Sequence, residues 1–309
     1  MQNRRMFSFV KLPFTGSSRV TVTMAMFLCR RLRVPSFPSL RAFSLRNLNH
    51  IFWSYLSARK WMRRQRQLNS IVVVGDSHVN FFSGNENISF TPFYYRSIKD
   101  NFKTKIYINT CSDKLDHFST LHLGPCLAYS VCRDKSSTLT KEKLLFLFEK
   151  EIIPMGARVL FSFGEIDIRV HVIKQAIKQQ KSVSEICEEI ISGFLNQLLE
   201  FRSKYDIKVY CWAPPPSQNE SPCFNKEFPT YGTEIERNKV TLIFEEILAE
   251  KCKEFSFTFL SITKMLIDEE YRTKKNFISD DSCHLSQKAW GNEMTSLAYM
   301  ELKKKGLLK

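Results

Sequence analysis

Acidic residues are absent from the first 75 positions of this 309-residue sequence. The same stretch holds 14 of the 46 Lys and Arg residues, the last of them Arg66. The rest of the chain therefore contains 32 basic residues and all 31 acidic residues. The formal charge of +15 therefore belongs almost entirely to one end of the chain. Because a partner responds to a local patch of charge rather than to the total, the nearly neutral body gives no reason to expect a nucleic-acid partner.

The sequence also lacks paired cysteines and long apolar runs. Its nine cysteines are odd in number and include no Cys-x-x-Cys pair, so neither a zinc cage nor a disulfide framework is indicated. No stretch approaches the roughly 20 apolar residues that cross a bilayer, and the segment 20–29 is shorter and interrupted by threonines. A reduced, cytoplasmic compartment is expected, and the basic end of the chain leaves a membrane-peripheral location or organellar targeting open.

Residues 1–66 differ from the rest of the chain in composition. Arginines are interleaved with Phe, Leu and Ser, a pattern typical of organellar transit peptides and of basic segments that lie on anionic membranes. A poorly ordered leader, or sequence upstream of an internal start at Met24, Met26 or Met62, fits the pattern equally well. No recognised nucleic-acid-binding module accompanies the charge. We therefore expect a basic leader, with an anionic membrane surface as its candidate partner, and one folded domain (67–309).

From Ile71 onward, short apolar runs alternate with longer segments of helical period. This alternation predicts an α/β domain with a mainly parallel sheet. Candidate strands span residues 71–74, 105–108, 158–163, 207–212 and 256–260, and candidate helices span 186–199, with Ser184 as its cap, 235–255 and 286–304. Ligands of open α/β sheets bind beyond the carboxyl ends of the strands. The polar stretches 75–78 and 164–171 follow predicted strands, and 281–284 precedes the last predicted helix.

The stretch 75–78, Gly-Asp-Ser-His, ends the first predicted strand with a candidate nucleophile. A serine hydroxyl reacts at neutral pH when a base lies within hydrogen-bond reach and an acid orients that base. His284 and Asp281, three residues apart, are the candidates for base and acid. A tight turn begun by Gly75 would expose Ser77, and the following helix would direct backbone N–H groups at developing negative charge. Taken singly, each motif also fits an ordinary turn or a capping aspartate.

In this order, with Gly-Asp-Ser after the first strand and Asp-x-x-His before the last helix, the motifs resemble those of the SGNH/GDSL hydrolases over residues 71–307. That family comprises esterases, lipases, deacetylases and some acyltransferases. The resemblance implies a flavodoxin-like, three-layer α/β/α sandwich with a mainly parallel central sheet. It also implies Ser77 as the nucleophile, His284 as the base and Asp281 as the acid, and it implies no metal ion and no organic cofactor.

Two further blocks of the family have counterparts of unequal quality. The segment HLGPCLAYS supplies Gly124, whose backbone N–H is implied as an oxyanion donor. The third block, Gly-x-Asn-Asp in the family, reads Gly-Glu-Ile-Asp from Gly164, with Ile166 where an asparagine donor belongs. Losing one such donor typically costs ~10²- to 10³-fold in rate. Either a substitute donor acts, or the domain is a slow or non-catalytic relative. The Gly-Glu-x-Asp-x-Arg form also resembles family members linked to surface-polysaccharide modification.

Polar residues alternate with apolar ones after the third predicted strand, at Glu165, Asp167, Arg169 and His171. On an extended strand end these four side chains would share one face. Arg169 would then pair with Glu165 or Asp167 and project toward a polar substrate, or supply positive charge near the oxyanion. Pairing that only supports the structure is an equal alternative, and His171 is expected to be solvated. The candidate oxyanion and substrate-binding residues are Gly124, Asp76, Glu165, Asp167 and Arg169.

His78 raises a metal-dependent alternative, because Gly-Asp-x-His also occurs in metallophosphoesterases. No Asp-x-His lies on an earlier strand and no Gly-Asn-His follows, so the sequence does not predict a dinuclear metal site. His117 and His122 have no partners at ligand spacing and are expected to be ordinary polar residues. Aromatic side chains of the body either line an acyl or sugar pocket or pack in the core. The candidates are Tyr129, Trp212 and Trp290.

The sequence therefore predicts a serine ester hydrolase. Its expected substrate is a small acyl ester of a carbohydrate (a glycan ester) or of another polar small molecule, and the same site would act as an acyltransferase where a hydroxyl replaces water. The alternative is a catalytically weak binding domain that the basic leader recruits to a membrane or envelope assembly. Hydrolysis of an ester that Ser77→Ala abolishes would separate the two hypotheses.

Overall fold

The computed structural model describes residues 71–83, 90–94, 105–109, 118–217, 230–277, 284–285 and 300–306. Several predictions fall outside these ranges, namely the leader at 1–66, the acid Asp281, His117, Trp290 and most of the helix at 286–304. None of the helices in the described ranges combines the length and the apolar character needed to traverse a lipid bilayer.

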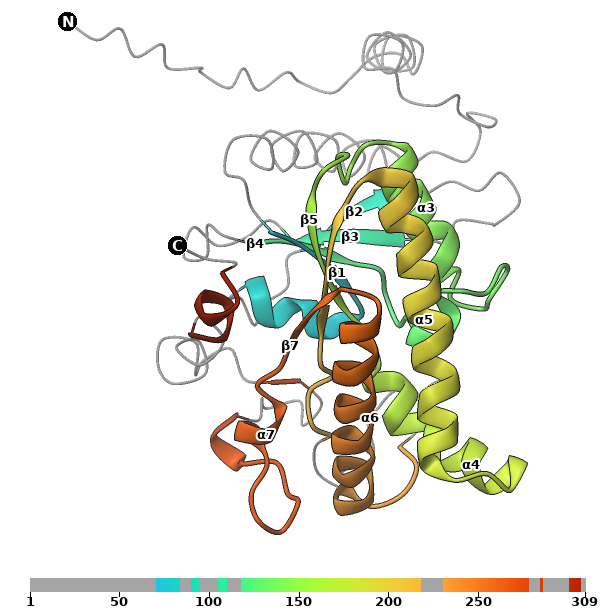
Figure 1. The fold of residues 1–309 in the computed structure, drawn as a ribbon, viewed down its shortest axis with the longest axis vertical. Coiled ribbons are helices and arrows are strands. Elements are labelled where there is room, and N and C mark those ends of the chain that lie inside the picture. Colours follow the sequence, from blue (N-terminus) through green and yellow to red (C-terminus); the bar gives the residue numbers. More distant parts are fainter. Residues whose placement is uncertain are drawn as a thin grey trace, which may run out of the picture. The chain divides into compact units, whose positions relative to one another are not determined.

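A seven-stranded sheet lies at the centre of the described part of the chain (Figure 1). Its strands are β1 (Ile71–Gly75), β2 (Phe90–Tyr94), β3 (Lys105–Asn109), β4 (Phe118–His122), β5 (Arg158–Ser162), β6 (Lys208–Trp212) and β7 (Thr258–Leu260). Their order is β2-β3-β4-β1-β5-β6-β7. The strands from β4 to β7 run parallel, whereas β3 is antiparallel to β4 and β2 is antiparallel to β3. The predicted, mainly parallel sheet is confirmed.

The order of the parallel strands identifies the fold class. Numbered along the chain, β1, β4, β5, β6 and β7 stand in the spatial order 2-1-3-4-5, which is the flavodoxin-like arrangement. In such a sheet, the connections leave in opposite directions between the first and third parallel strands, and a crevice opens at their carboxyl ends. Here these strands are β1 and β5, paired up to Gly75 and Ser162. The polar stretches after both strands therefore meet at the switch point of the topology.

The described ranges contain helices of three kinds. The α-helices in the described ranges are α3 (Thr140–Glu149), α4 (Ile173–Gln179), α5 (Val183–Tyr205), α6 (Glu234–Glu254) and α7 (Thr263–Leu266). The 3-10 helices are η2 (Ser77–Ser83), η3 (Ala128–Ser130) and η5 (Lys275–Phe277), and η4 (Asp167–Val172) is a π-helical segment.

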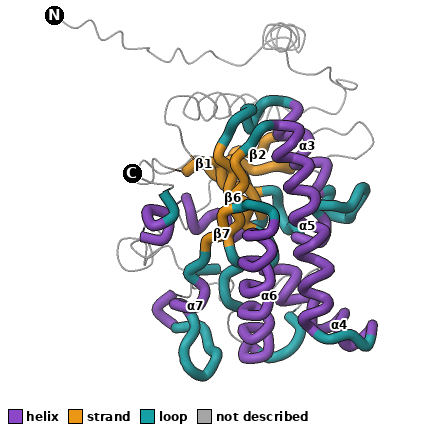
Figure 2. The backbone as a smooth tube through the Cα atoms, viewed as in Figure 1, coloured by secondary structure: helices purple, strands orange, loops and turns teal. Residues whose placement is uncertain are grey.

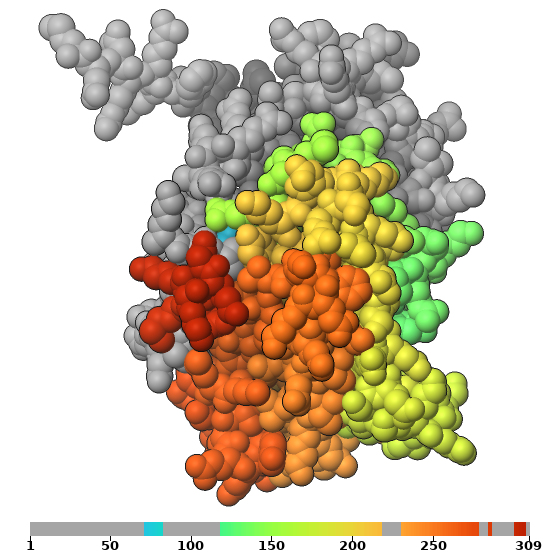
Figure 3. Space-filling view, in the orientation of Figure 1, coloured from blue at the N-terminus to red at the C-terminus, as the bar shows by residue number. Residues whose placement is uncertain are grey.

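Two apolar clusters cover opposite faces of the sheet. Along β1, Val72 and Val74 pack in the cluster that holds α3, α5 and α6, whereas Ile71 and Val73 pack with η2, α7 and Leu302. Because successive strand side chains point to opposite faces, helices lie on both sides of the sheet. Figures 1 and 2 show α5 and α6 side by side, and Figure 3 shows their side chains forming adjoining bands. The three-layer α/β/α sandwich is confirmed.

The two longest helices begin with reciprocal caps. The sequence placed the cap of α5 at Ser184, which is wrong, because Ser182 caps the helix. The Ser182 hydroxyl accepts a hydrogen bond from the Glu185 N–H at 3.2 Å, and the Glu185 carboxylate accepts one from the Ser182 N–H at 2.7 Å. Thr233 and Glu236 make the same pair of bonds at the start of α6. Each capping box satisfies N–H groups that a helix leaves without an internal partner.

The segment after β5 is helical rather than extended. The strand ends at Ser162, the chain becomes helical at Glu165, and η4 follows from Asp167. The prediction that Glu165, Asp167, Arg169 and His171 share one face of a strand end is therefore wrong. Residues four apart meet on a helix, so Glu165 lies against Arg169 while Asp167 points elsewhere.

Strands β2 and β4 were not among the predicted strands. In β4 the polar residues Ser119 and Thr120 are buried, at 1% and 0% exposure. A buried strand is recognised in a sequence by a continuous apolar run, and these two polar residues interrupt that run in β4.

Candidate active site

A close approach between two strands shapes the corner at the end of β1. A Cβ atom on Gly75 would lie 1.9 Å from the carbonyl oxygen of Ser162 on β5, so the position requires glycine. The N–H of Asp76 donates to the same oxygen at 3.3 Å. The chain then turns directly into η2, whose first residue, Ser77, is half-buried between the buried Asp76 and His78. The corner thus presents the serine hydroxyl.

The hydroxyl of Ser77 meets the ring of His284. The Oγ and Nε2 atoms are 2.7 Å apart, although the two residues are 207 positions apart in the sequence. This is a hydrogen-bond distance, so the predicted nucleophile and base lie within reach of each other. A pocket opens at this pair, lined by Ser77, His78, Asn80, Phe81, Trp212, Pro215, His284 and Leu285. The role of Asp281 as the orienting acid stays a prediction.

Asp76 holds a neighbouring imidazole instead of facing the pocket. Its Oδ1 atom accepts a hydrogen bond from the backbone N–H of His78 at 2.9 Å and lies 3.0 Å from Nδ1 of the same ring. Asp76 is 1% exposed, whereas His78 lines the pocket with its ring centroid 4.9 Å from that of His284. Asp76 therefore acts on the pocket by orienting His78. The sequence considered His78 as a metal ligand and missed its place in the pocket wall.

Strand β4 brings a third imidazole to this region. His122 is buried at the end of β4, in register with Gly75. Burial lowers the pKa of His122 to about 3, and the positive charges of His284, Lys143 and His78 act in the same direction. His122 is therefore neutral near pH 7. The sequence did not predict that His122 lies near Ser77 and His284, because His122 has no partner at a recognisable spacing.

Gly124 lies beside the corner that carries Ser77, the predicted nucleophile. The N–H of Leu123 donates to the carbonyl of Gly75 at 2.9 Å, which continues the pairing of β4 with β1 past the strand end. Gly124 is buried and has a φ of +86°, in the left-handed region that glycine adopts without strain. No backbone carbonyl of the described residues accepts a hydrogen bond from the Gly124 N–H. The role of the Gly124 N–H as an oxyanion donor stays a prediction.

The altered third block places an apolar side chain in this region. Ile166 is 4% exposed and packs in a small cluster with Leu127 and Val170. Its side chain offers no hydrogen-bond donor. Any stabilisation of an oxyanion here must come from other groups.

Glu165 and Arg169 form a buried ion pair. The Nε of Arg169 donates to Oε1 of Glu165 at 2.7 Å, and the two side chains are 9% and 4% exposed, respectively. Burial acts to raise the pKa of Glu165, but the charge and hydrogen bond of Arg169 hold that pKa below its ordinary value. Of the two predicted partners of Arg169, Glu165 is therefore the one that the Nε of Arg169 contacts.

Asp167 joins two loops of the site. Its carboxylate oxygens accept hydrogen bonds from the N–H groups of Ala128 at 2.7 Å and Tyr129 at 3.1 Å. Asp167 is fully buried, and burial raises its pKa to about 7 despite these bonds. The carboxylate thus fixes the start of η3 against η4. A contact of Asp167 with substrate stays a prediction.

Two of the aromatic candidates lie in different environments. Trp212 lines the pocket and packs against the ring of Phe82, with centroids 4.9 Å apart. Tyr129 is 42% exposed and lies beneath the guanidinium of Arg133, 3.9 Å from the ring centroid. Trp212 therefore belongs to the pocket and Tyr129 to the surface.

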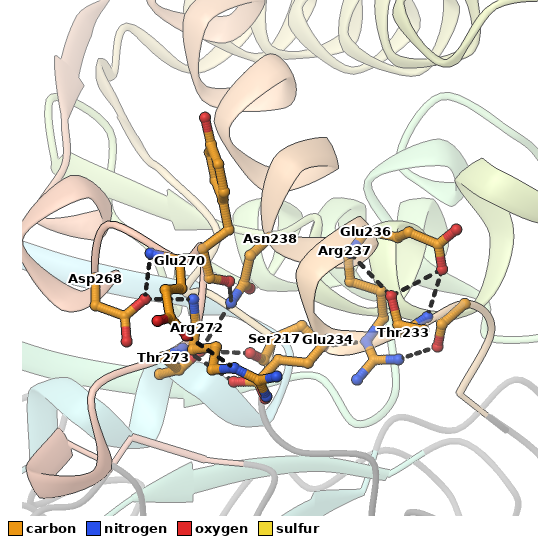
Figure 4. Close-up of polar contacts among 12 residues, drawn as sticks. Ser217, Thr233, Glu234, Glu236, Arg237, Asn238, Asp268, Glu270, Arg272 and Thr273 are labelled. Carbon is orange, nitrogen blue, oxygen red and sulfur yellow. Dashed lines mark hydrogen bonds and ion pairs between the residues drawn. The ribbon is translucent and has the colours of Figure 1, made fainter.

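A polar network links the start of α6 to Ser217 and Thr273 (Figure 4). The fully buried Arg237 donates from Nε to the Ser217 hydroxyl at 2.5 Å. The Thr273 hydroxyl donates to the Ser217 carbonyl at 2.5 Å, and Glu234 accepts a hydrogen bond from the Thr273 N–H at 2.9 Å. These contacts hold the loop after β6, whose residue Pro215 lines the pocket.

The fold and the site together define the class of this chain. It is a flavodoxin-like α/β domain with a serine–histidine pair at the switch point of its sheet. Similar solved structures include a GDSL-like lipase from Bacteroides thetaiotaomicron, with 12% identity over 83% of this chain and 98% of that chain and a TM-score of 0.45. A carbohydrate acetylesterase from Sinorhizobium meliloti has 14% identity over 77% and 99%, with a TM-score of 0.42. The aryl esterase of M. smegmatis has 13% identity over 77% and 100%, with a TM-score of 0.41.

Because these identities and TM-scores are low, the likeness assigns no activity or substrate to this chain. No model of a protein family matches the sequence, and no curated protein matches it.

Proposed function

We propose that this chain is a serine ester hydrolase. The observation that carries the proposal is the 2.7 Å contact between Ser77 Oγ and His284 Nε2 at a pocket beyond the carboxyl end of β1. A serine in hydrogen-bond contact with an imidazole is the arrangement that activates an alcohol for acyl transfer. The resemblance of the Gly-Asp-Ser and Asp-x-x-His motifs to the SGNH/GDSL hydrolases supports the same chemistry.

The reaction proceeds in two halves. The Ser77 oxygen attacks the ester carbonyl while His284 takes the hydroxyl proton, and His284 then gives that proton to the leaving alkoxide. Water attacks the acyl-enzyme with His284 again as base, which releases the carboxylic acid and restores Ser77. The backbone N–H groups of Ser77 and Gly124 stabilise the oxyanion of each tetrahedral intermediate. Asp281 orients the imidazole.

The substrate that we propose is a small acyl group on a carbohydrate or another polar molecule. Apolar side chains of Trp212, Pro215 and Leu285 form part of the pocket wall, and polar side chains of His78 and Asn80 form another part. Such a wall suits a short acyl group attached to a polar alcohol. A second alcohol in place of water would turn the hydrolase into an acyltransferase at the same site. The reaction needs no cofactor.

Hydrolysis of p-nitrophenyl acetate tests the proposal. Wild type is expected to release p-nitrophenol well above background, and Ser77→Ala and His284→Gln are expected to reduce kcat by about 10⁴-fold or more, because the three groups of a triad act as a unit. Ser203→Ala, a substitution of an exposed serine on α5, is the matched control and is expected to keep wild-type turnover. Equal, background-level turnover by wild type and Ser77→Ala would contradict the proposal.

One observation favours a second candidate, a catalytically weak binding domain. Ile166 occupies the position of a family oxyanion donor and packs with Leu127 and Val170. Loss of one donor typically lowers kcat ~10²- to 10³-fold. On this reading, the basic leader would recruit the domain to a membrane or envelope assembly. Wild-type turnover that equals the turnover of Ser77→Ala would support the second candidate over the first.

A further inference from the structure

A buried lysine lies behind the loop that carries Gly124. Lys143 belongs to the first turn of α3 and is 5% exposed. Its Nζ atom donates a hydrogen bond to the carbonyl oxygen of Leu123 at 2.5 Å and lies 3.9 Å from Sγ of Cys126. The ammonium group therefore ends directly on the peptide unit that joins Leu123 to Gly124.

The stability of the fold does not account for a cation at this position. Within the described ranges, no carboxylate lies at ion-pair distance from Lys143. A buried charge without an opposite partner destabilises a protein. The positive end of the α3 dipole also lies at the first turn, where it disfavours a cation. An apolar side chain of the same length would fill this space at a lower cost.

The positive charge of Lys143 affects two neighbouring titratable side chains. The positive charge of Lys143 acts to lower the pKa of His122 and that of Cys126, although burial is the largest influence on both. The ammonium group thus affects its surroundings on the side of the site that holds His122 and Gly124.

Covalent geometry connects this contact to the proposed oxyanion donor. The carbonyl of Leu123 and the N–H of Gly124 belong to one peptide unit, which is trans like every other described peptide. In a trans peptide these two groups point in opposite directions. Lys143 holds the carbonyl end, so the N–H end is directed away from Lys143. A hydrogen bond from a cation to the carbonyl polarises the amide and strengthens the hydrogen bond that its N–H donates.

We infer that Lys143 is a positioning residue that fixes and polarises the Leu123–Gly124 peptide, so that the Gly124 N–H becomes a stronger oxyanion donor. This inference rests on the proposed ester hydrolase activity. It also offers a substitute for the side-chain donor that Ile166 does not supply. The buried N–H of Gly124, which donates to no backbone carbonyl within the described ranges, is the group through which the lysine acts.

Substitution of Lys143 separates this role from a structural one. Lys143→Met removes the charge and keeps the length of the side chain, and Lys143→Gln keeps a neutral hydrogen-bond donor. Both variants of the full-length protein are assayed with p-nitrophenyl acetate for kcat and KM, and their thermal unfolding is measured. Lys141→Met, on the same helix, is the matched control, because Lys141 pairs with the exposed Asp134.

The expected signature is a loss of activity without a loss of stability. Lys143→Met should lower kcat by about tenfold or more, with KM changed by less than about twofold, because the polarised donor acts on the transition state. Its Tm should equal or exceed that of wild type, because an unpaired buried charge is gone. Lys143→Gln should lie between Lys143→Met and wild type in kcat, and Lys141→Met should match wild type.

Three results would overturn the inference. If wild type turns over the ester and folded Lys143→Met keeps its kcat, the lysine has no catalytic effect and the proposed function stands. If Lys143→Met does not fold, Lys143→Gln decides, and a kcat equal to that of wild type would refute the role. If wild type shows no turnover above Ser77→Ala, the proposed function and the inference fail together.

Discussion

Three imidazoles gather near the hydroxyl of Ser77, and the proposed reaction requires their charges to differ. His284 must gain a proton as Ser77 attacks. His122 does not oppose this gain, because burial lowers its pKa to about 3 and keeps it neutral. His78 lies 3.0 Å from the carboxylate of Asp76, so a proton on its ring would be offset by an adjacent negative charge. His284 is thus the imidazole to which the proposed reaction assigns the proton, while His122 stays neutral.

Asp167 predicts a measurable dependence of stability on pH. Its pKa is raised from 3.8 to about 7 by burial, so between about pH 4 and pH 7 the folded state keeps a proton that the unfolded state has released. The free energy of unfolding should therefore fall as pH rises through this window. Asp167→Asn cannot release a proton and should lack this fall. Urea unfolding of both proteins at pH 4 to 8 measures the difference.

The pH dependence, and not the absolute stability, is the readout for Asp167. The amide nitrogen of asparagine accepts no hydrogen bond, whereas both oxygens of a protonated carboxyl group keep lone pairs for the two N–H groups, so Asp167→Asn should be less stable at low pH. Its deficit should shrink as pH rises toward 7. Asp134→Asn, at an exposed position, is the control and should differ from wild type by a nearly constant amount. A constant difference for Asp167→Asn as well would contradict the raised pKa.

At the scale of elements, local signals set the ends of the long helices. In α5 the capping box joins Ser182 to Glu185, and in α6 it joins Thr233 to Glu236. The two helices pack on the same face of the sheet through the larger apolar cluster. Each capping box therefore fixes the start of a helix that covers this face of the sheet.

The cap of α5 is tested by two neighbouring serines. Ser182→Ala should lower the free energy of unfolding by about 1 kcal/mol, because the Glu185 N–H loses its acceptor. Ser184→Ala, two residues further along and exposed, should have little effect or a slight stabilising one, because alanine favours a helix interior. Chemical unfolding of the two variants gives the comparison. Equal losses in both would contradict the assignment of the cap to Ser182.

Sequence patterns predicted some elements and missed others for physical reasons. The run 71–74 and the runs of β5 and β6 are mostly apolar, as strands of a parallel sheet covered on both faces must be. Buried polar residues hid β4. The alternation from Glu165 to His171 predicted a strand, but the chain is helical there. The tertiary contact of Asp167 with the η3 turn and the i,i+4 pair of Glu165 with Arg169 both favour the helix over the alternating pattern.

At the scale of the whole molecule, the topology assembles the site. The reversal of strand order between β1 and β5 opens the crevice in which Ser77 lies. The short motifs were enough to bring Ser77 and His284 together, because a serine nucleophile needs a base within reach. Gly124 was named from the family resemblance, and its role as a donor stays a prediction. Lys143 could not be named from sequence, because a lysine in an amphipathic helix usually faces solvent and its burial follows only from packing of α3.

The basic leader predicts a separable function for residues 1–66. Its removal takes away 14 basic residues and leaves 32 basic against 31 acidic ones. Full-length protein should sediment with vesicles that contain anionic lipid at low salt, since each basic residue near such a surface contributes about 1 kcal/mol. The 67–309 protein should stay in the supernatant and keep its esterase kcat within about twofold.

Two controls define this result. Vesicles of neutral lipid should not retain the full-length protein, and high salt should release it from anionic vesicles, because salt screens surface charges. Binding of the 67–309 protein as tightly as the full chain would place the membrane contact in the folded domain instead.

Labelling with a fluorophosphonate probe tests the central claim, that Ser77 is an activated nucleophile, most directly. Such a probe modifies a serine whose hydroxyl an adjacent base has made reactive. Wild-type protein should gain the mass of a single adduct, located by peptide mapping on Ser77, and Ser77→Ala should gain none. Absence of an adduct from folded wild type, or an adduct on another residue with Ser77 unmodified, would contradict the account.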